Sequence, residues 1–308
     1  MEKVLVLGSI NIDFVSFISK YPRPGETLVC KDFEIFQGGK GANQAIALSK
    51  LGIPTLMLGK IGDDPLKGFT LSLLKDSGVD ISRISVSKEK STGSASIWVN
   101  DQGQNSIIIY PGANGEVDRS YIVDNKKCFC DSSFLVTQFE VPAESVFFAL
   151  KTAKEYGLKT IVDPAPVRDI KNDSFWKLID YLLPNEIEIK ELTKCNNILD
   201  GILALKCKGA KEVIVKLGKH GACYETKGKI ALVPSILPEK TVVDTTGAGD
   251  CFVAGFLYGL IQEYDIKKAI RFANLVASYS IKKKGAAISF PKKSEIIWNK
   301  SNKGEYKL

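Results

Sequence analysis

The chain has 308 residues, of which 44% are hydrophobic and 25% charged, and its formal net charge is +7. This balance excludes a disordered or fibrous protein, and the length allows one large core or two modest ones. Seven scattered cysteines and a single histidine argue against both a disulfide framework and a zinc site. The chain opens without a signal-like segment and has no apolar run of roughly 20 residues, so we expect a cytoplasmic protein that does not enter the membrane.

Much of the positive charge lies toward the C-terminus, on Lys282, Lys283, Lys284, Lys292, Lys293, Lys300 and Lys303. These lysines are not interleaved with aromatic residues and belong to no nucleic-acid-binding motif. We therefore expect a solvated surface with a weak field that favours anionic substrates such as ATP, and no nucleic-acid partner.

Strand-like and helical patterns alternate along most of the chain. Apolar β-rich runs occupy residues 4–7, 55–59, 134–136, 160–162 and 212–216, and helical patterns occupy 42–51, 66–77, 146–156 and 251–262. Continuous apolar strands separated by helices are typical of a sheet that is covered on both faces. The sequence predicts a single α/β domain over residues 1–308 with a doubly wound, mainly parallel sheet.

Two stretches depart from this alternation. Residues 27–36, 94–100 and 106–110 have the pattern of short strands without intervening helices, and the last two are joined by turn-forming residues 101–105. We expect a small antiparallel β lid, inserted at about 13–36 and 94–110. Such a projecting sheet would cover a site, form a dimer interface, or do both.

A glycine-rich segment with a terminal carboxylate precedes the last helical pattern, at residues 243–250, Val-Asp-Thr-Thr-Gly-Ala-Gly-Asp. Free N–H groups at the start of a helix favour a phosphate, and glycines allow it to approach closely. Asp250 would then lie beside the γ-phosphate and accept a proton from an attacking hydroxyl. The plainer alternative is an aspartate that caps a helix.

A second glycine-rich segment opens the first helical pattern, at residues 38–45, Gly-Gly-Lys-Gly-Ala-Asn-Gln-Ala. Lys40 and Asn43 are three apart and would share a helix face, while Asn11 and Asp13 share a face if the chain is extended. Amide and carboxylate groups of this kind bind vicinal hydroxyls. Each pair could instead cap a helix or lie in a solvated turn.

Residues 243–250 resemble the Asp-Thr-x-Gly-Ala-Gly-Asp signature of the ribokinase-like carbohydrate and nucleoside kinases, and residues 38–45 resemble the family's first signature. The resemblance covers nearly the whole chain, with matching segments at 8–13, 21–27, 62–64, 91–93, 111–114, 138–140, 163–166, 184–186 and 282–286. It implies transfer of the γ-phosphate of ATP to O5 of D-ribose. Kinases of a related pentose or a nucleoside, and a catalytically silent sugar-binding relative, remain alternatives.

The resemblance also assigns roles to individual positions. It implies that the sugar is bound by Asn11, Asp13, Gly39, Lys40, Asn43 and Glu140, with Asp250 completing the site. It implies that ATP is bound by Asn185, Lys216, Gly218, Gly221, Asn274 and the backbone of Gly247, Ala248 and Gly249, which forms the anion hole. Asn185 and Glu188, three apart on a helix that would begin at Asn185, would organise Mg²⁺ through water. K⁺ would bind Asp244, Thr246, Gly285 and Ser289.

Three positions need separate comment. Lys216 stands where the resemblance predicts threonine, and Asp163 stands where asparagine is common and is interpreted as structural. His220 lies in the nucleotide-binding turn and is interpreted as a surface or adenine-adjacent residue rather than a base.

Finally, we expect a homodimer through the lid, because the lid would otherwise expose Ile97, Trp98, Ile107 and Ile109.

Overall fold

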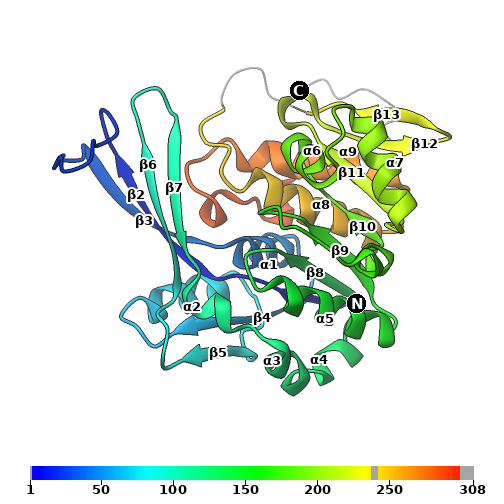
Figure 1. Cartoon of the computed structure of the whole chain (residues 1–308), viewed down its shortest axis with the longest axis horizontal. Helices are drawn as coiled ribbons and strands as arrows, with labels where there is room; N and C mark the ends of the chain where they lie inside the picture. The colour runs from blue at the N-terminus through cyan, green and yellow to red at the C-terminus, as the bar shows by residue number, and fades with distance from the viewer. Residues whose placement is uncertain (1, 237–241, 299–308) are drawn as a thin grey trace.

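The computed structural model describes residues 2–236 and 242–298, and its centre is a nine-stranded sheet (Figure 1). The strand order is β13-β12-β11-β10-β9-β8-β1-β4-β5, parallel from β5 to β11 and antiparallel for the last two strands. The bounds are β1 (Val4–Leu7), β4 (Thr55–Gly62), β5 (Ile84–Ser87), β8 (Phe134–Gln138), β9 (Lys159–Asp163), β10 (Tyr181–Leu182), β11 (Glu212–Lys216), β12 (Ala222–Thr226) and β13 (Lys229–Val233). The predicted doubly wound sheet is confirmed.

Helices cover both faces of this sheet. One core packs against α1 (Lys40–Lys50), α2 (Lys67–Asp76), α8 (Ala248–Ile261) and α9 (Ile266–Ser280). The other packs against α3 (Arg119–Asp124), α4 (Lys127–Cys130), α5 (Ala143–Glu155), α6 (Glu186–Thr193) and α7 (Ile198–Lys208). Strand β1 supplies Val4 and Val6 to the first core and Leu5 and Leu7 to the second, which explains its continuous apolar sequence.

Short 3₁₀ helices complete the body: η1 (Gly112–Glu116), η2 (Asp173–Leu178), η3 (Gly218–His220), η4 (Ala287–Ser289) and η5 (Lys293–Glu295). Within the described ranges, no helix is both long and apolar enough to cross a membrane. Lys300 and Lys303, which belong to the basic cluster, lie outside the described residues.

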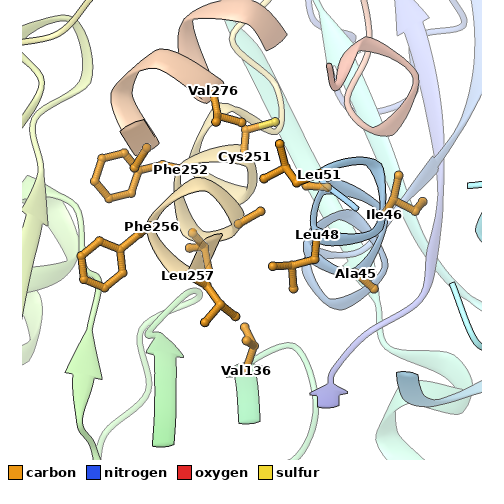
Figure 2. Packing of buried hydrophobic residues seen from close by; sticks show 14 of the residues in the cluster. Ala45, Ile46, Leu48, Leu51, Val136, Cys251, Phe252, Phe256, Leu257 and Val276 are labelled. Carbon is orange, nitrogen blue, oxygen red and sulfur yellow. The ribbon is translucent and has the colours of Figure 1, made fainter. Parts of the chain in front are cut away.

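The contact between α1 and α8 fixes the site that lies at their N-termini. Figure 2 shows Leu48 and Leu51 on the side of α1 that faces α8, opposite Cys251 and Leu257, with Val136 of β8 nearby. Each of these side chains is buried, and complete burial of one aliphatic side chain stabilises a fold by about 1.5–3 kcal/mol. The two helices are thus held in one relative position, which determines how their first turns meet.

The smaller sheet projects from the body as a lid, seen at the left of Figure 1. It consists of β2 (Asn11–Phe17), β3 (Asp32–Gly38), β6 (Gly93–Val99) and β7 (Asn105–Tyr110), in the order β3-β2-β6-β7. Both outer pairs are antiparallel, but the central pair β2–β6 is parallel, which the sequence did not predict. Both strands leave the body in the same direction, and β2 follows β1 after only residues 8–10.

The predicted strand at residues 27–36 starts later than expected. The register of β2 and β3 ends with Phe17 opposite Asp32, and residues 27–31 precede the strand, although Lys31 N still donates to Phe17 O at 2.7 Å. At its other end the strand continues to Gly38, which brings it directly to the start of α1.

Candidate active site

The predicted site residues gather at one edge of the large sheet. Strands β1, β8, β9 and β11 end there, α1 and α8 begin there, and the base of the lid faces them. The carboxyl edge of a doubly wound sheet is where such folds bind ligands.

Asp250 lies in the first turn of α8 and is only 5% exposed. Asn43 Nδ2 donates to its Oδ2 and Gln44 Nε2 donates to its Oδ1, both at 3.0 Å. Burial raises the pKa of Asp250 to about 6, with the Lys40 ammonium lowering it and the Asp163 carboxylate raising it. The side chain is therefore ionised at neutral pH and still basic enough to accept a proton.

The segment before Asp250, predicted to be a phosphate cradle, forms a tight turn that leads into α8. Gly247 is the N-cap of the 14-residue α8 and has φ 75°, a left-handed conformation that favours glycine. A Cβ atom at Gly247 would lie 2.6 Å from the Phe290 ring, so no larger residue fits. At Gly249 the space is open toward Lys216, whose Nζ is the nearest neighbour at 3.8 Å from a Cβ placed there. Backbone N–H groups at this helix start can donate hydrogen bonds to a phosphate.

The lid and α1 supply the polar groups predicted to bind the sugar. Asn11 and Asp13 lie on β2 with one residue between them, so they share a face of the lid. Asn114 Nδ2 donates to Asn11 Oδ1 at 2.6 Å, which fixes the orientation of that amide. A Cβ on Gly38 would come within 2.2 Å of both carboxylate oxygens of Asp13, so only glycine leaves room for this carboxylate.

Glu140 ties the body side of the sugar site together. Its Oε2 accepts hydrogen bonds from Ser9 Oγ at 2.5 Å and from the Lys40 backbone N–H at 3.0 Å, directly after Gly39. Burial, and then the Glu140 and Asp250 carboxylates, raise the pKa of Asp13 to about 7. Two of these carboxylates, Glu140 and Asp250, also act on a nearby ammonium group.

That ammonium belongs to Lys40, the first residue of α1. Burial alone would lower the pKa of Lys40, but the carboxylates of Asp163, Asp250, Glu140 and Glu188 raise it above its ordinary value. Lys40 is therefore permanently charged, and it offsets part of the negative charge around the sugar groups.

Asn185 and Glu188 are close together, but they are arranged differently from the prediction. Asn185 precedes α6 as its N-cap, rather than lying on the helix, and the two side chains form a capping box. Asn185 N and Nδ2 each donate to Glu188 at 2.7 Å, and Asn185 Oδ1 accepts from the N–H groups of Ile187 and Glu188. Glu188 is buried and Asn185 is half-buried, and the oxygens of both side chains are already partly engaged.

The predicted nucleotide turn follows β11. Gly218 and Gly221 both have positive φ angles, 54° and 95°, around the exposed η3 that contains His220. Asn274 lies farther along the same side on α9, and its Nδ2 donates to the carbonyl groups of Val233 and Pro234. This amide secures the end of β13, and its contact with adenine stays a prediction.

The residues predicted to bind K⁺ are partly linked by hydrogen bonds. Asp244 Oδ1 accepts from the N–H and hydroxyl of Thr246, and its Oδ2 accepts from Gly285 N at 2.8 Å. Burial opposes this arrangement, but these bonds hold the pKa of Asp244 below its usual value. Ser289 is buried nearby in η4 and donates to Ala286 O at 2.8 Å.

Two further groups belong to the site although no role was predicted for them. Gln44 Nε2 donates to both Asp250 and Asp163, and Gln138 Nε2 fixes its amide by donating to Gln44 Oε1 at 2.5 Å. Asp163, interpreted from the sequence as structural, also accepts a hydrogen bond from Lys216. Gln44 follows Asn43 directly, and its position in the same motif was the available signal.

Comparison with known proteins defines the class. The pfkB family carbohydrate kinases match residues 1–293, and the chain therefore belongs to this family. It is 35% identical over 302 residues to a ribokinase of Staphylococcus aureus, covering 96% of this chain and 98% of the relative. It is also 35% identical over 298 residues to a deoxyribokinase of Salmonella typhi, covering 94% and 95%.

A solved structure confirms the fold. The Arabidopsis thaliana ribokinase complexed with ribose and ATP superimposes with a TM-score of 0.87 at 31% identity, covering 95% of this chain and 96% of that one. The Thermotoga maritima ribokinase gives 0.87 at 33% identity, covering 96% and 98%. The chain is a carbohydrate kinase with the predicted architecture.

Proposed function

We propose that this carbohydrate kinase transfers the γ-phosphate of ATP to O5 of D-ribose, giving ADP and D-ribose 5-phosphate in the cytoplasm. The observation that carries this proposal is the position of Asp250, a buried and basic carboxylate between the sugar groups and the phosphate cradle. The ribokinases of similar sequence, and the one solved with ribose and ATP, support it.

In this reaction the O5 oxygen attacks the γ-phosphorus while the bond to the β-phosphate oxygen breaks. Asp250 accepts the O5 proton as the new O–P bond forms. The N–H groups of Gly247, Ala248 and Gly249 stabilise the charge on the transferring group. The remaining hydroxyls bind Asn11, Asp13, Gly39, Lys40, Asn43 and Glu140.

ATP lies along the cradle, with Asn185, Lys216, Gly218, Gly221 and Asn274 around it. A divalent metal accompanies ATP in such kinases, and Mg²⁺ is the ion that suits phosphate and water ligands. Among the residues that the structure describes, no group of three or more Asp, Glu, His and Cys side chains is arranged to hold a metal. Because the Asn185 and Glu188 oxygens are partly engaged, they fit Mg²⁺ through water rather than directly.

K⁺ fits the loop that carries Asp244, Thr246, Gly285 and Ser289. A carboxylate, a hydroxyl and backbone carbonyl groups are the hard oxygen ligands that such an ion uses. A bound ion would supply positive charge beneath the cradle and fix the shape of its turn.

The substrate is tested by measuring phosphorylation of D-ribose, 2-deoxy-D-ribose, D-fructose and adenosine with ATP and Mg²⁺, with ³¹P NMR locating the new ester. We expect the highest kcat/KM for ribose and a phosphate on O5. A preference for 2-deoxyribose would instead support the second candidate function, which the equally similar deoxyribokinase favours. Phosphorylation of none of these compounds would reject the proposal.

We further propose that two copies associate through their lids. All six residues of β7 are exposed, including Ile107, Ile108 and Ile109 at 50, 62 and 48%. An edge strand that is apolar on both faces is a ready partner for another chain. Light scattering should give the mass of a dimer for the native protein and of a monomer for Ile108→Lys. A native monomer at micromolar concentration would contradict the proposal.

A further inference from the structure

Lys216 and Asp163 form an ion pair at the edge of the site. Lys216 Nζ lies 2.7 Å from Asp163 Oδ1, and the two side chains are 13% and 1% exposed. They stand at the ends of β11 and β9, so the lysine reaches across the position of β10 between them. Replacing a buried ion pair by uncharged groups often leaves stability unchanged or improves it, so stability is a weak reason for its presence.

Each end of this pair contacts the machinery of phosphoryl transfer. On one side, Lys216 Nζ is the nearest atom to a Cβ built on Gly249, at 3.8 Å, so the ammonium lies against the cradle. On the other side, Asp163 Oδ2 accepts from Gln44 Nε2, and the same nitrogen donates to Asp250 Oδ1. The ammonium beside the cradle is therefore linked through Asp163 and Gln44 to the base.

The ammonium has capacity left for a ligand. A lysine carries three N–H donors, and in the described part of the chain its hydrogen bond goes to Asp163. Two donors remain for phosphate oxygens, which form strong charge-assisted hydrogen bonds with an ammonium. The carboxylate holds the flexible lysine side chain in place before ATP binds, which reduces the entropy lost on binding.

We propose that Lys216 is a catalytic residue that binds the transferring phosphate of ATP, and that Asp163 positions both Lys216 and, through Gln44, the base Asp250. This inference rests on the proposed function for the identity of the base. It gives Lys216 and Asp163, the two residues that depart from the family pattern, one shared role.

The pair also affects the charge on the base. The charged groups that act on Asp250 include Lys40 from α1, Asp163 from β9 and Asp13 from the lid. Loss of Lys216 alone would leave the Asp163 carboxylate without its partner close to Asp250. Loss of both members removes that charge, so we expect the double variant Lys216→Met/Asp163→Asn to be faster than Lys216→Met.

The kinetic test uses Lys216→Met, Asp163→Asn and their combination, with ribose as acceptor. We expect kcat to fall about 10²-fold for Lys216→Met, less for Asp163→Asn, and to recover partly in the combination, which gives a coupling between the sites. Additive effects in this cycle would overturn the positioning role of Asp163. Unchanged kcat and KM for ATP in Lys216→Met would overturn the role of Lys216.

A binding test without sugar separates this inference from the proposed function. Calorimetry should show that Lys216→Met weakens ATP binding about tenfold while AMP binding stays as in the native protein. An equal loss of affinity for ATP and AMP would mean that the nucleotide-binding turn has been distorted. No loss of ATP affinity would mean that the ammonium does not reach the phosphates. Either outcome rejects the proposal. The result does not depend on which sugar the native enzyme phosphorylates.

The matched control is Lys211→Met. Lys211 immediately precedes β11 at its opposite end, and its Nζ lies 2.7 Å from the buried Asp180. Lys211 resembles Lys216 in pairing distance, but its side chain is 66% exposed rather than 13%, and it lies at the opposite end of the strand. We therefore expect native ATP affinity and kcat for Lys211→Met. Thermal melting checks that each variant folds, and Lys216→Leu replaces Lys216→Met in both tests if the methionine variant does not fold.

Discussion

Buried aspartates lie at both edges of the large sheet, and their surroundings are opposite in character. At the edge where β10 begins, Asp180 is bound by the ammonium groups of Lys154 and Lys211 and by the Thr160 N–H. Burial opposes its ionisation, but these partners hold the pKa of Asp180 below its usual value. This carboxylate is more stable ionised in the fold than in water.

At the edge where the strands end, the pKa of Asp13 is raised to about 7 and that of Asp250 to about 6, mainly by burial. Neighbouring carboxylates contribute to both shifts, and the Lys40 ammonium opposes the shift of Asp250. The fold keeps these two groups less stable as anions than they would be in water. The comparison separates a carboxylate that stabilises the fold from carboxylates that are held ready for a ligand. Strongly shifted pKa values in enzymes concentrate at functional sites.

The largest expected effect concerns the base itself. We expect Asp250→Asn to lower kcat by roughly 10²–10⁴-fold and to change ribose affinity little, because the amide keeps the shape and removes the proton acceptor. The buried Asn43 Oδ1 has no hydrogen-bond partner in the described structure and can accept the new N–H after its amide rotates. Steady-state kinetics and calorimetric ribose titration provide the measurement, and near-native turnover would remove Asp250 from its role.

At the opposite edge the effect should fall on stability instead. We expect Asp180→Asn to lower the free energy of unfolding by about 2–3 kcal/mol at pH 7, because two ammonium groups lose their buried partner. Since the folded-state pKa is depressed, the difference should disappear as the pH falls through that pKa. Urea unfolding at pH 7 and pH 3, with kcat as the control, tests this; a large loss of kcat with native stability would reverse the interpretation.

The same measurement on Asp250→Asn should have the opposite sign. Because the pKa of Asp250 is raised to about 6, the folded state binds this proton more tightly than the unfolded chain. Native stability therefore loses a contribution as the pH rises from about 4 through 6. At pH 7.5 we expect the variant to be more stable than the native protein by on the order of 1–2 kcal/mol, and to lose this advantage near pH 4. Lower stability at pH 7.5 would mean that the carboxylate is structural.

Asp244 is an informative exception, a carboxylate at the functional edge that accepts three hydrogen bonds and has a lowered pKa. If K⁺ binds there, turnover should rise several-fold when K⁺ replaces Na⁺ or a bulky organic cation at equal ionic strength, because the ion fixes the cradle. Asp244→Ala should abolish this difference. Equal rates of the native enzyme in all salts would instead make Asp244 a cap of the turn.

The sequence predicted those parts of the site that are continuous in the chain. Asp250 and the cradle lie within eight residues, and Lys40 and Asn43 lie on one helix turn, so local geometry was enough. The chain from Lys216 through Asp163 and Gln44 to Asp250 joins residues separated by 53, 119 and 206 positions. Only the packing of α1 against α8 and the order of the strands bring these groups together.

The lid was predicted in location but only partly in topology. The turn at residues 101–105 and the alternating strands around it are local features, and they appear as β6 and β7. Parallel pairing of β2 with β6 depends instead on where both strands leave the body, which no local pattern encodes. The capping role of Asn185 was likewise missed, because the sequence placed the helix start one residue too early.

Strand β2 belongs to the lid and also carries Asn11 and Asp13, whereas Lys40, Asn43 and Asp250 belong to the body. Rotation of the lid away from the body would therefore divide the predicted sugar site into two incomplete parts. We expect a bound sugar to link the lid to the body, so a change in lid position should change ribose affinity. The position of a single strand, β2, would then couple binding of the sugar to exclusion of water from the γ-phosphate.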